Sequence, residues 1–231
     1  MVSVDDIDLS EYYGKSRKSE KILSTLKESI FAGILIGFGG AVYLSVPNRT
    51  LGAFLFAFGL LTILIYQQKL YTGAIGYAGK IYGAGTLTLI FLGNLIGTAL
   101  TGFLLKCSNL SIASNAAALI VKKGDLIRHS WDDPIPVLVA GIFCGILMYL
   151  GVDSWRKETL PGAARVLMVI LAVALFILCG FEHCIADMFY LFAADHSDIP
   201  VGIRSLFVLY VAIGNSAGAL GIAALLAKKE D

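Results

Sequence analysis

Three ionisable side chains stand close together in a part of the sequence that is otherwise apolar. Glu182, His183 and Asp187 follow one apolar run and precede another. Imidazole has an unperturbed pKa near 6.5, so His183 is the side chain suited to take up and release a proton near neutral pH. In a soluble protein such a histidine is usually a core residue whose hydrogen bonds are satisfied. Inside a membrane an ionisable residue marks a functional site by default.

The composition places these residues in a membrane. Hydrophobic residues make up 57% of the 231 positions, charged residues 15%, and the mean hydropathy is +0.79. A soluble domain has about 45–50% apolar and about 25% charged residues. With a net charge of +1, we expect a lipid bilayer and no nucleic acid as partner. The four cysteines form no CxxC pair, and no histidine stands at zinc-finger spacing, so we expect no metal or cofactor.

Apolar runs near the length of a spanning helix, about 20 residues, predict six crossings. They cover residues 29–46, 51–66, 82–105, 136–152, 164–181 and 206–227. Two shorter apolar pieces, 72–78 and 184–194, cannot cross alone. Residues 122–133 are charged and predict a loop at the membrane surface.

The Lys and Arg residues predict the orientation. Most of them fall on the side of the N-terminus, and such residues are enriched in cytoplasmic loops. We therefore expect both termini in the cytoplasm. We expect residues 1–26 to form a polar cytoplasmic arm and residues 27–231 to form a single transmembrane pore domain.

Two polar interruptions follow apolar runs, and each precedes a similar motif. The first break is residues 66–73 and the second break is residues 180–188. The apolar run after each break carries Gly-Asn-x-x-Gly, centred on Asn94 and on Asn215. This echo predicts two inverted repeats of three helices each, with a binding site near the midplane where the interrupted helices meet.

The second break resembles the formate/nitrite transporter family. Residues 180–189 resemble that family's Gly-Phe-Glu-His-Ser-(Ile/Val)-Ala-Asn-Met-Phe signature, and residues 70–72 resemble its Leu-Phe-Thr. The similarity runs from about residue 23 to the C-terminus. It implies an all-α, aquaporin-like membrane fold, a homopentamer with one pore per protomer, and a place in the inner (plasma) membrane. The implied cargo is a small monovalent anion, with formate first and nitrite or hydrosulfide as alternatives.

The chain departs from the family pattern at four positions. Lys69 stands where the family usually has an acidic residue. Gly145 and Asp187 each stand where it usually has Asn. The family often has a lysine ahead of the fourth span, and counting back from Gly145 puts His129 at that place. These departures leave the fold expectation intact and widen the choice of anion.

An anion pore with apolar constrictions needs a proton donor between them, because the neutral acid crosses such constrictions far more easily than the ion. We expect His183 to donate that proton, Thr72 to hydrogen-bond both the imidazole and the anion, and Glu182 to orient the backbone. The pore-lining residues expected from the ungapped match are Phe56 and Phe176 on the outer side, and Leu60, Leu70, Tyr71 and Met148 on the cytoplasmic side. Supporting roles are expected for Asn94, Asn215, Lys69 and His129.

Two other classes of function are less compatible with the sequence. An aquaporin-like pore for neutral solutes would carry paired Asn-Pro-Ala motifs, and the sequence contains no Asn-Pro. A membrane enzyme would need a nucleophile or a metal cluster. The His, Glu and Asp expected within the bilayer share one short segment, so we do not expect an enzyme.

Overall fold

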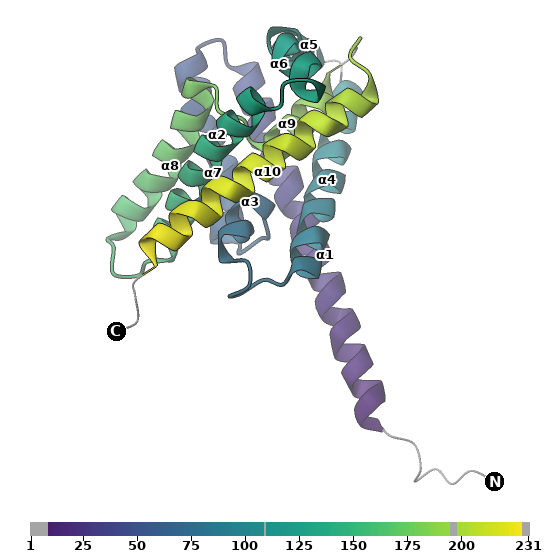
Figure 1. The fold of residues 1–231 in the computed structure, drawn as a ribbon, viewed down its shortest axis with the longest axis vertical. Coiled ribbons are helices and arrows are strands. Elements are labelled where there is room, and N and C mark those ends of the chain that lie inside the picture. Colours follow the sequence, from purple (N-terminus) through teal and green to yellow (C-terminus); the bar gives the residue numbers. More distant parts are fainter. Residues whose placement is uncertain (1–8, 109, 195–197, 228–231) are drawn as a thin grey trace, which may run out of the picture.

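The computed structural model describes residues 9–108, 110–194 and 198–227, and this part of the chain forms helices joined by short connections (Figure 1). The first half contains α1 (Leu9–Ser45), α2 (Arg49–Ile65), α3 (Tyr71–Ala74), the 3-10 turn η2 (Ile75–Tyr77) and α4 (Ala84–Lys106). A connecting region contains α5 (Ile112–Lys122), α6 (Gly124–Arg128) and the 3-10 turn η3 (His129–Trp131). The second half contains α7 (Ile135–Arg156), α8 (Gly162–Cys179), α9 (Cys184–Ala193) and α10 (Val201–Leu226).

The helix lengths are those of a multi-pass membrane protein. Within the described residues, five helical stretches are long and apolar enough to cross a membrane: Lys18–Ser45 of α1, and α4, α7, α8 and α10. They match five of the six predicted crossings. The remaining prediction, residues 51–66, forms α2, which has only 17 residues. The two short apolar pieces form α3 with η2, and α9.

The connection between the halves differs from the prediction. Residues 122–133 were expected to form a loop, but they form α6 and η3, and they follow the unpredicted helix α5. The apolar residues of α5 are spaced at helical intervals, and Ile112, Ala116 and Ile120 are buried. With 11 residues, α5 is too short to span a bilayer, so a search for spanning runs overlooks it.

The predicted arm, residues 1–26, is helical where it is described. α1 starts at Leu9 and continues without interruption to Ser45, and its first turns extend beyond the helical bundle (Figure 1). Residues 1–8 lie outside the described part of the chain. The start of α1 and the end of α10 lie at the same end of the bundle, opposite α5 and α6 (Figure 1).

Glycines bring the first and the last long helix of each half into backbone contact. α1 packs on α4, and an added Cβ on Gly97 would lie 2.1 Å from the carbonyl oxygen of Ile30. α7 packs on α10 in the same way, and an added Cβ on Gly218 would lie 2.0 Å from the carbonyl oxygen of Ile142. No other residue type fits at such distances. The Gly-Asn-x-x-Gly motifs therefore serve close helix packing, as small residues commonly do in membranes.

Large apolar side chains cover much of the exterior. Among those exposed are Phe38, Phe58, Phe103 and Leu225. A monomeric soluble protein rarely exposes so much apolar surface in one region. Lipid or neighbouring protomers are the surroundings that suit these side chains.

Candidate functional site

The second break fixes His183 at the start of a helix. α8 ends at Gly180, whose φ of +75° lies in the left-handed region that glycine adopts without steric cost. Three residues later, Nδ1 of His183 accepts a hydrogen bond of 3.1 Å from the backbone N–H of Ala186 and so caps α9. His183 is buried. The cap and the burial together hold the imidazole in one orientation.

The cap also determines which nitrogen of the neutral ring carries the proton. Because Nδ1 accepts from Ala186, the hydrogen of neutral imidazole belongs on Nε2. Nε2 lies 3.0 Å from Oγ1 of Thr72, a residue of α3 that is 111 positions away in the sequence. His183 therefore donates to the hydroxyl of Thr72, whose own hydrogen remains available to an acceptor such as an anion. The expectation that these two residues approach each other is confirmed.

Asn215 holds the second break in place with three buried hydrogen bonds. Its Nδ2 donates to the carbonyl oxygens of Gly141 and Glu182, both at 2.8 Å. Its Oδ1 accepts from the backbone N–H of Cys184 at 3.0 Å. One side chain thus joins α10, α7 and both sides of His183.

Asn94 does the same for the first break. Its Nδ2 donates to the carbonyl oxygens of Ser29 and Lys69, at 2.7 and 2.9 Å. Its Oδ1 accepts from the backbone N–H of Tyr71 at 2.8 Å. Each Asn therefore bonds a carbonyl of the first helix of its half, a carbonyl of the break, and the amide two residues farther on. This repeated pattern is what an internal repeat would produce.

Aromatic rings cover one side of the Thr72–His183 pair. Phe176 stacks on the imidazole of His183, with ring centroids 5.4 Å apart and planes at 26°. Phe56 meets Phe176 edge to face at 5.9 Å. Both phenylalanines are buried. The structure therefore brings together the two residues expected to form the outer constriction and places one of them directly on the histidine.

On the other side the expected residues are only partly brought together. Leu60 and Leu70 line one cavity, and Met148 is buried in the core that also contains both leucines. Tyr71 is turned toward α10, where its hydroxyl lies 2.9 Å from Oγ of Ser216. Of the four residues expected at this constriction, the two leucines face the cavity directly.

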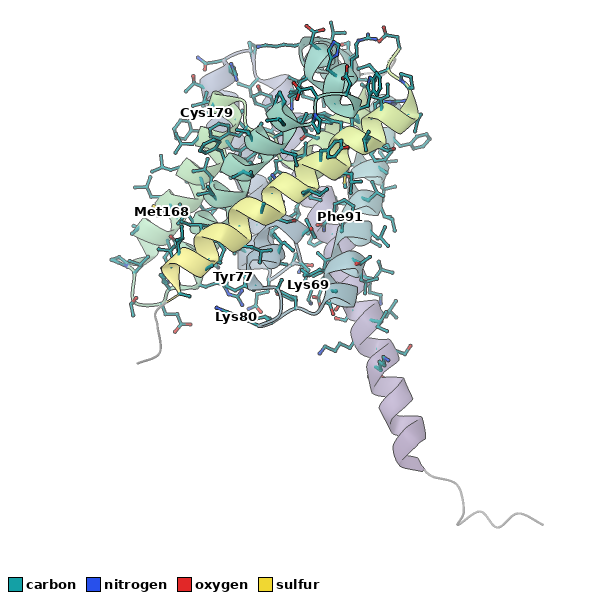
Figure 2. The ribbon with its side chains drawn as sticks, viewed as in Figure 1. Lys69, Tyr77, Lys80, Phe91, Met168 and Cys179 are labelled. Atoms are coloured by element: carbon teal, nitrogen blue, oxygen red, sulfur yellow. The ribbon has the colours of Figure 1, made fainter. Side chains whose placement is uncertain are left out.

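The cavity has a volume of about 620 Å³ and basic residues among its lining. It lies between the ends of α2 and α7 and the start of α8. Lys69, labelled in Figure 2 toward the end of the bundle where α1 begins, lines it and pairs with Glu28 of α1. The other charged residues in its wall are Arg156, Glu158 and Arg165. The wall has more positive than negative charges, which favours anions.

A lysine that the sequence interpretation passed over stands against the second break. Nζ of Lys123, at the link between α5 and α6, pairs with the carboxylate of Glu182 and lies 2.8 Å from Oδ1 of Asp187. His129, expected at this place, has a side chain that is 68% exposed and faces Asp132 at 3.5 Å. Lys123, and not the exposed His129, is therefore the basic residue that stands against the second break.

Two features of the sequence could have identified Lys123. Buried carboxylates need a cation or a donor, and Glu182 and Asp187 lie in an apolar segment. Lys123 also stands directly after the helical apolar pattern of α5. Counting back from Gly145 without gaps leads to His129, because that count does not allow for the short helices of the connection.

Comparison with known proteins adds a family and a fold. The sequence profile described as "Formate/nitrite transporter" matches residues 7–228. The formate channel FocA of Haemophilus influenzae is 23% identical over 225 residues, which cover 88% of this chain and 75% of that protein. The formate channel FocB of Escherichia coli is 26% identical over 192 residues, 72% of this chain and 65% of that protein. These relatives are channels and not enzymes.

Solved structures of the same fold exist. A chain described as "FNT family ion channel" superposes with a TM-score of 0.75 at 21% identity, covering 90% of both chains. One described as "Pentameric formate channel with formate bound" also gives 0.75, at 23% identity, covering 89% of this chain and 96% of that one. The all-helical fold is therefore shared with channels of known structure.

Proposed function

Because the chain belongs to the formate/nitrite transporter family, we propose that it forms a pore for small monovalent anions, with formate as the first candidate. The observation that carries this proposal is the 3.0 Å contact between Oγ1 of Thr72 and Nε2 of His183. It joins two short helices that follow breaks in the chain, and it lies between stacked aromatic rings and a leucine-lined cavity. Nitrite and hydrosulfide are the alternative cargoes.

The energetics favour passage as the neutral acid. Moving a bare ion into a low-dielectric constriction costs tens of kcal/mol in an idealised estimate. Protonating a carboxylate of pKa about 4 at pH 7 costs only about 4 kcal/mol. A site that offers a hydrogen-bond donor and a proton between two apolar constrictions therefore lowers the larger barrier.

His183 and Thr72 divide this work. The hydroxyl of Thr72 accepts from Nε2 of His183 and directs its own hydrogen to the anion. For His183 to donate a proton and stay neutral, its ring must first become imidazolium, which requires a proton on Nδ1. That proton displaces the hydrogen bond from Ala186, so proton uptake by His183 loosens the cap of α9.

The surrounding residues support this arrangement. Asn94 and Asn215 hold the two breaks, and Lys69 adds positive potential to the cavity. The side chain of Glu182 pairs with Lys123, and its backbone carbonyl accepts from Asn215. His129 lies outside this arrangement.

We extend the proposal to assembly and location. The chain forms a homopentamer with one pore per protomer. The similar solved structure described as "Pentameric formate channel with formate bound" supports this assembly. Each protomer is built from two inverted three-helix repeats in an aquaporin-like arrangement, supported by the matching hydrogen bonds of Asn94 and Asn215. The protein lies in the inner (plasma) membrane with both termini in the cytoplasm. The start of α1 and the end of α10 lie at the same end of the bundle, as this orientation requires (Figure 1).

Flux into proteoliposomes tests the cargo and the site together. We expect formate to enter faster than glycerol, with nitrite and hydrosulfide measured in parallel. Thr72→Val keeps the shape of the side chain and removes the hydroxyl. It should raise the free-energy barrier to formate by about 1–2 kcal/mol, which lowers formate flux roughly 5- to 30-fold. Thr88→Val is the matched control, because Thr88 is exposed and its hydroxyl donates to the carbonyl of Ala84 in its own helix. Glycerol flux without anion flux would favour a neutral-solute pore, and equal flux in both variants would exclude Thr72 from the site.

A further inference from the structure

One lysine is shared by two carboxylates directly beside the proposed permeation site. The side chains of Glu182 and Asp187 are 4% and 3% exposed, and that of Lys123 is 19% exposed. The ring of Tyr190 also faces Lys123, with Nζ 5.7 Å from the centroid. Glu182 precedes His183 in the sequence, and Asp187 follows it by one helical turn of α9. The charge of this group, the Lys123 cluster, therefore acts on whatever occupies the site.

The Lys123 cluster does not balance its charges when both carboxyls are ionised. One ammonium and two carboxylates leave a net charge of −1, and a buried uncompensated charge is unfavourable enough that a group neutralises instead. A single bound proton brings the Lys123 cluster to zero. The cluster therefore has two states that differ by one charge.

Asp187 is the carboxyl suited to bind that proton. Its Oδ1 accepts from Lys123, while its Oδ2 is buried and has no hydrogen-bond partner among the residues that the structure describes. A buried carboxylate oxygen without a donor is poorly stabilised as an anion. Protonation of Oδ2 removes the charge from the carboxylate oxygen that has no donor in the described part of the chain.

The other groups around Asp187 do not supply the missing charge. The remaining titratable side chains near it are His183 and Cys184 at the start of α9, Cys144 of α7, Tyr190 of α9 and, beside Tyr190, Tyr43 of α1. Thiols and phenols are uncharged near neutral pH, and His183 is neutral while it caps α9. Asn215 of α10, whose side chain accepts from the backbone N–H of Cys184 at the start of α9, carries no charge. While His183 is neutral, the charge at this place is thus set by the Lys123 cluster.

We propose that Asp187 is a charge gate: an anion occupies the Thr72–His183 site only when Asp187 carries a proton. The proton comes from water at the end of the bundle formed by α5 and α6, binds the carboxylate as the anion arrives, and returns to water when the anion leaves. Asp187 does not touch the anion. It determines whether the anion meets a net charge of −1 or zero. This inference rests on the proposed function, because it concerns the occupancy of the same site.

Asp187→Asn tests the gate, since it fixes the cluster at zero charge while keeping the shape and leaving Lys123 paired with Glu182. Two unit charges about 10 Å apart at an effective dielectric constant near 20 interact strongly enough to change occupancy on the order of tenfold, and Asp187 lies one helical turn from His183. We therefore expect formate flux at pH 8 to rise on the order of tenfold above the parent, with flux at pH 5 unchanged. Glu182→Gln should act in the same direction, because it also removes one negative charge from the cluster.

The matched control is Asp198→Asn. Asp198 is exposed in the connection before α10, and the guanidinium of Arg128 donates to it and lowers its pKa below the ordinary value. It stays ionised from pH 5 to 8 and lies outside the Lys123 cluster, so we expect its removal to leave the pH profile unchanged.

Infrared difference spectroscopy gives a readout independent of flux. Adding ¹³C-formate to the parent at pH 8 should produce the carbonyl band of a protonated carboxylic acid with unlabelled carbon, and Asp187→Asn should lack this band. Suppose that the parent moves formate and that the Asp187→Asn protein keeps the parent's pH profile and infrared band. This result would overturn the role of Asp187 as a gate and leave the proposed function standing. A parent that moves no formate would overturn the proposed function itself.

Discussion

Replacing Asn215 by Ala should destabilise the second break and displace His183. The substitution removes three buried hydrogen bonds, to Gly141, Glu182 and Cys184. Side-chain hydrogen bonds contribute about 0.6 kcal/mol each in measured membrane proteins and up to about 1.5 kcal/mol elsewhere. The three together come to about 2–4.5 kcal/mol. For a chain of this size that loss lowers the melting temperature by about 4–18 °C.

Thermal melting of the detergent-solubilised protein measures this loss. Asn115→Ala is the control, because Asn115 is exposed and, among the described residues, its side chain makes one hydrogen bond, to the carbonyl of Leu44 at 2.8 Å. Asn94→Ala should match Asn215→Ala, since Asn94 makes the equivalent three bonds in the first half. The equivalence of the two halves would be refuted by either of two results. One is an Asn215→Ala protein with the same melting temperature as Asn115→Ala, and the other is an Asn94→Ala protein with the melting temperature of the parent.

Two further substitutions test the packing and the cavity. Gly145→Ala places a Cβ 2.1 Å from the carbonyl oxygen of Asn215, so α7 and α10 must separate. We expect the free energy of unfolding to fall by about 1–3 kcal/mol, seen as a lower melting temperature. Stability equal to that of the parent would contradict the backbone contact. Lys69→Glu replaces the partner of Glu28 with a like charge and turns the potential of the cavity toward negative. It should lower formate flux by roughly threefold to tenfold without moving the pH profile, and an unchanged flux at low salt would show that this charge does not act on the anion.

Much of the fold and of the central site could be predicted from the sequence because the membrane simplifies the physics. A bilayer requires long apolar helices, and it tolerates polar interruptions only where protein or water surrounds them. The two breaks therefore identified Thr72 and His183, although the pair is separated by 111 positions. The Gly-Asn-x-x-Gly motifs indicated the packing, but not that each Asn would hold its own break.

The residues that were missed lie where the membrane imposes no such rule. α5 and α6 connect the two halves, and their short helices bring Lys123 to Glu182 by a path that a count along the chain cannot follow. Tyr71 was expected beside Leu70 in one constriction. Adjacent residues in a helix point in different directions, and the bond of Tyr71 to Ser216 turns it away. Contacts of this kind depend on tertiary packing.

The dependence of formate flux on pH in a His183→Asn protein tests the central claim most directly. Asn is a favourable helix N-cap, so this variant keeps the cap of α9 at Ala186 while removing the group that titrates; His183→Ala removes both. We expect the parent's flux to rise as the pH falls from about 8 to about 5, the range in which histidine titrates. We expect His183→Asn to stay low throughout that range with the melting temperature of the parent. A His183→Asn protein with the parent's flux and pH profile would contradict the role of His183 as proton donor.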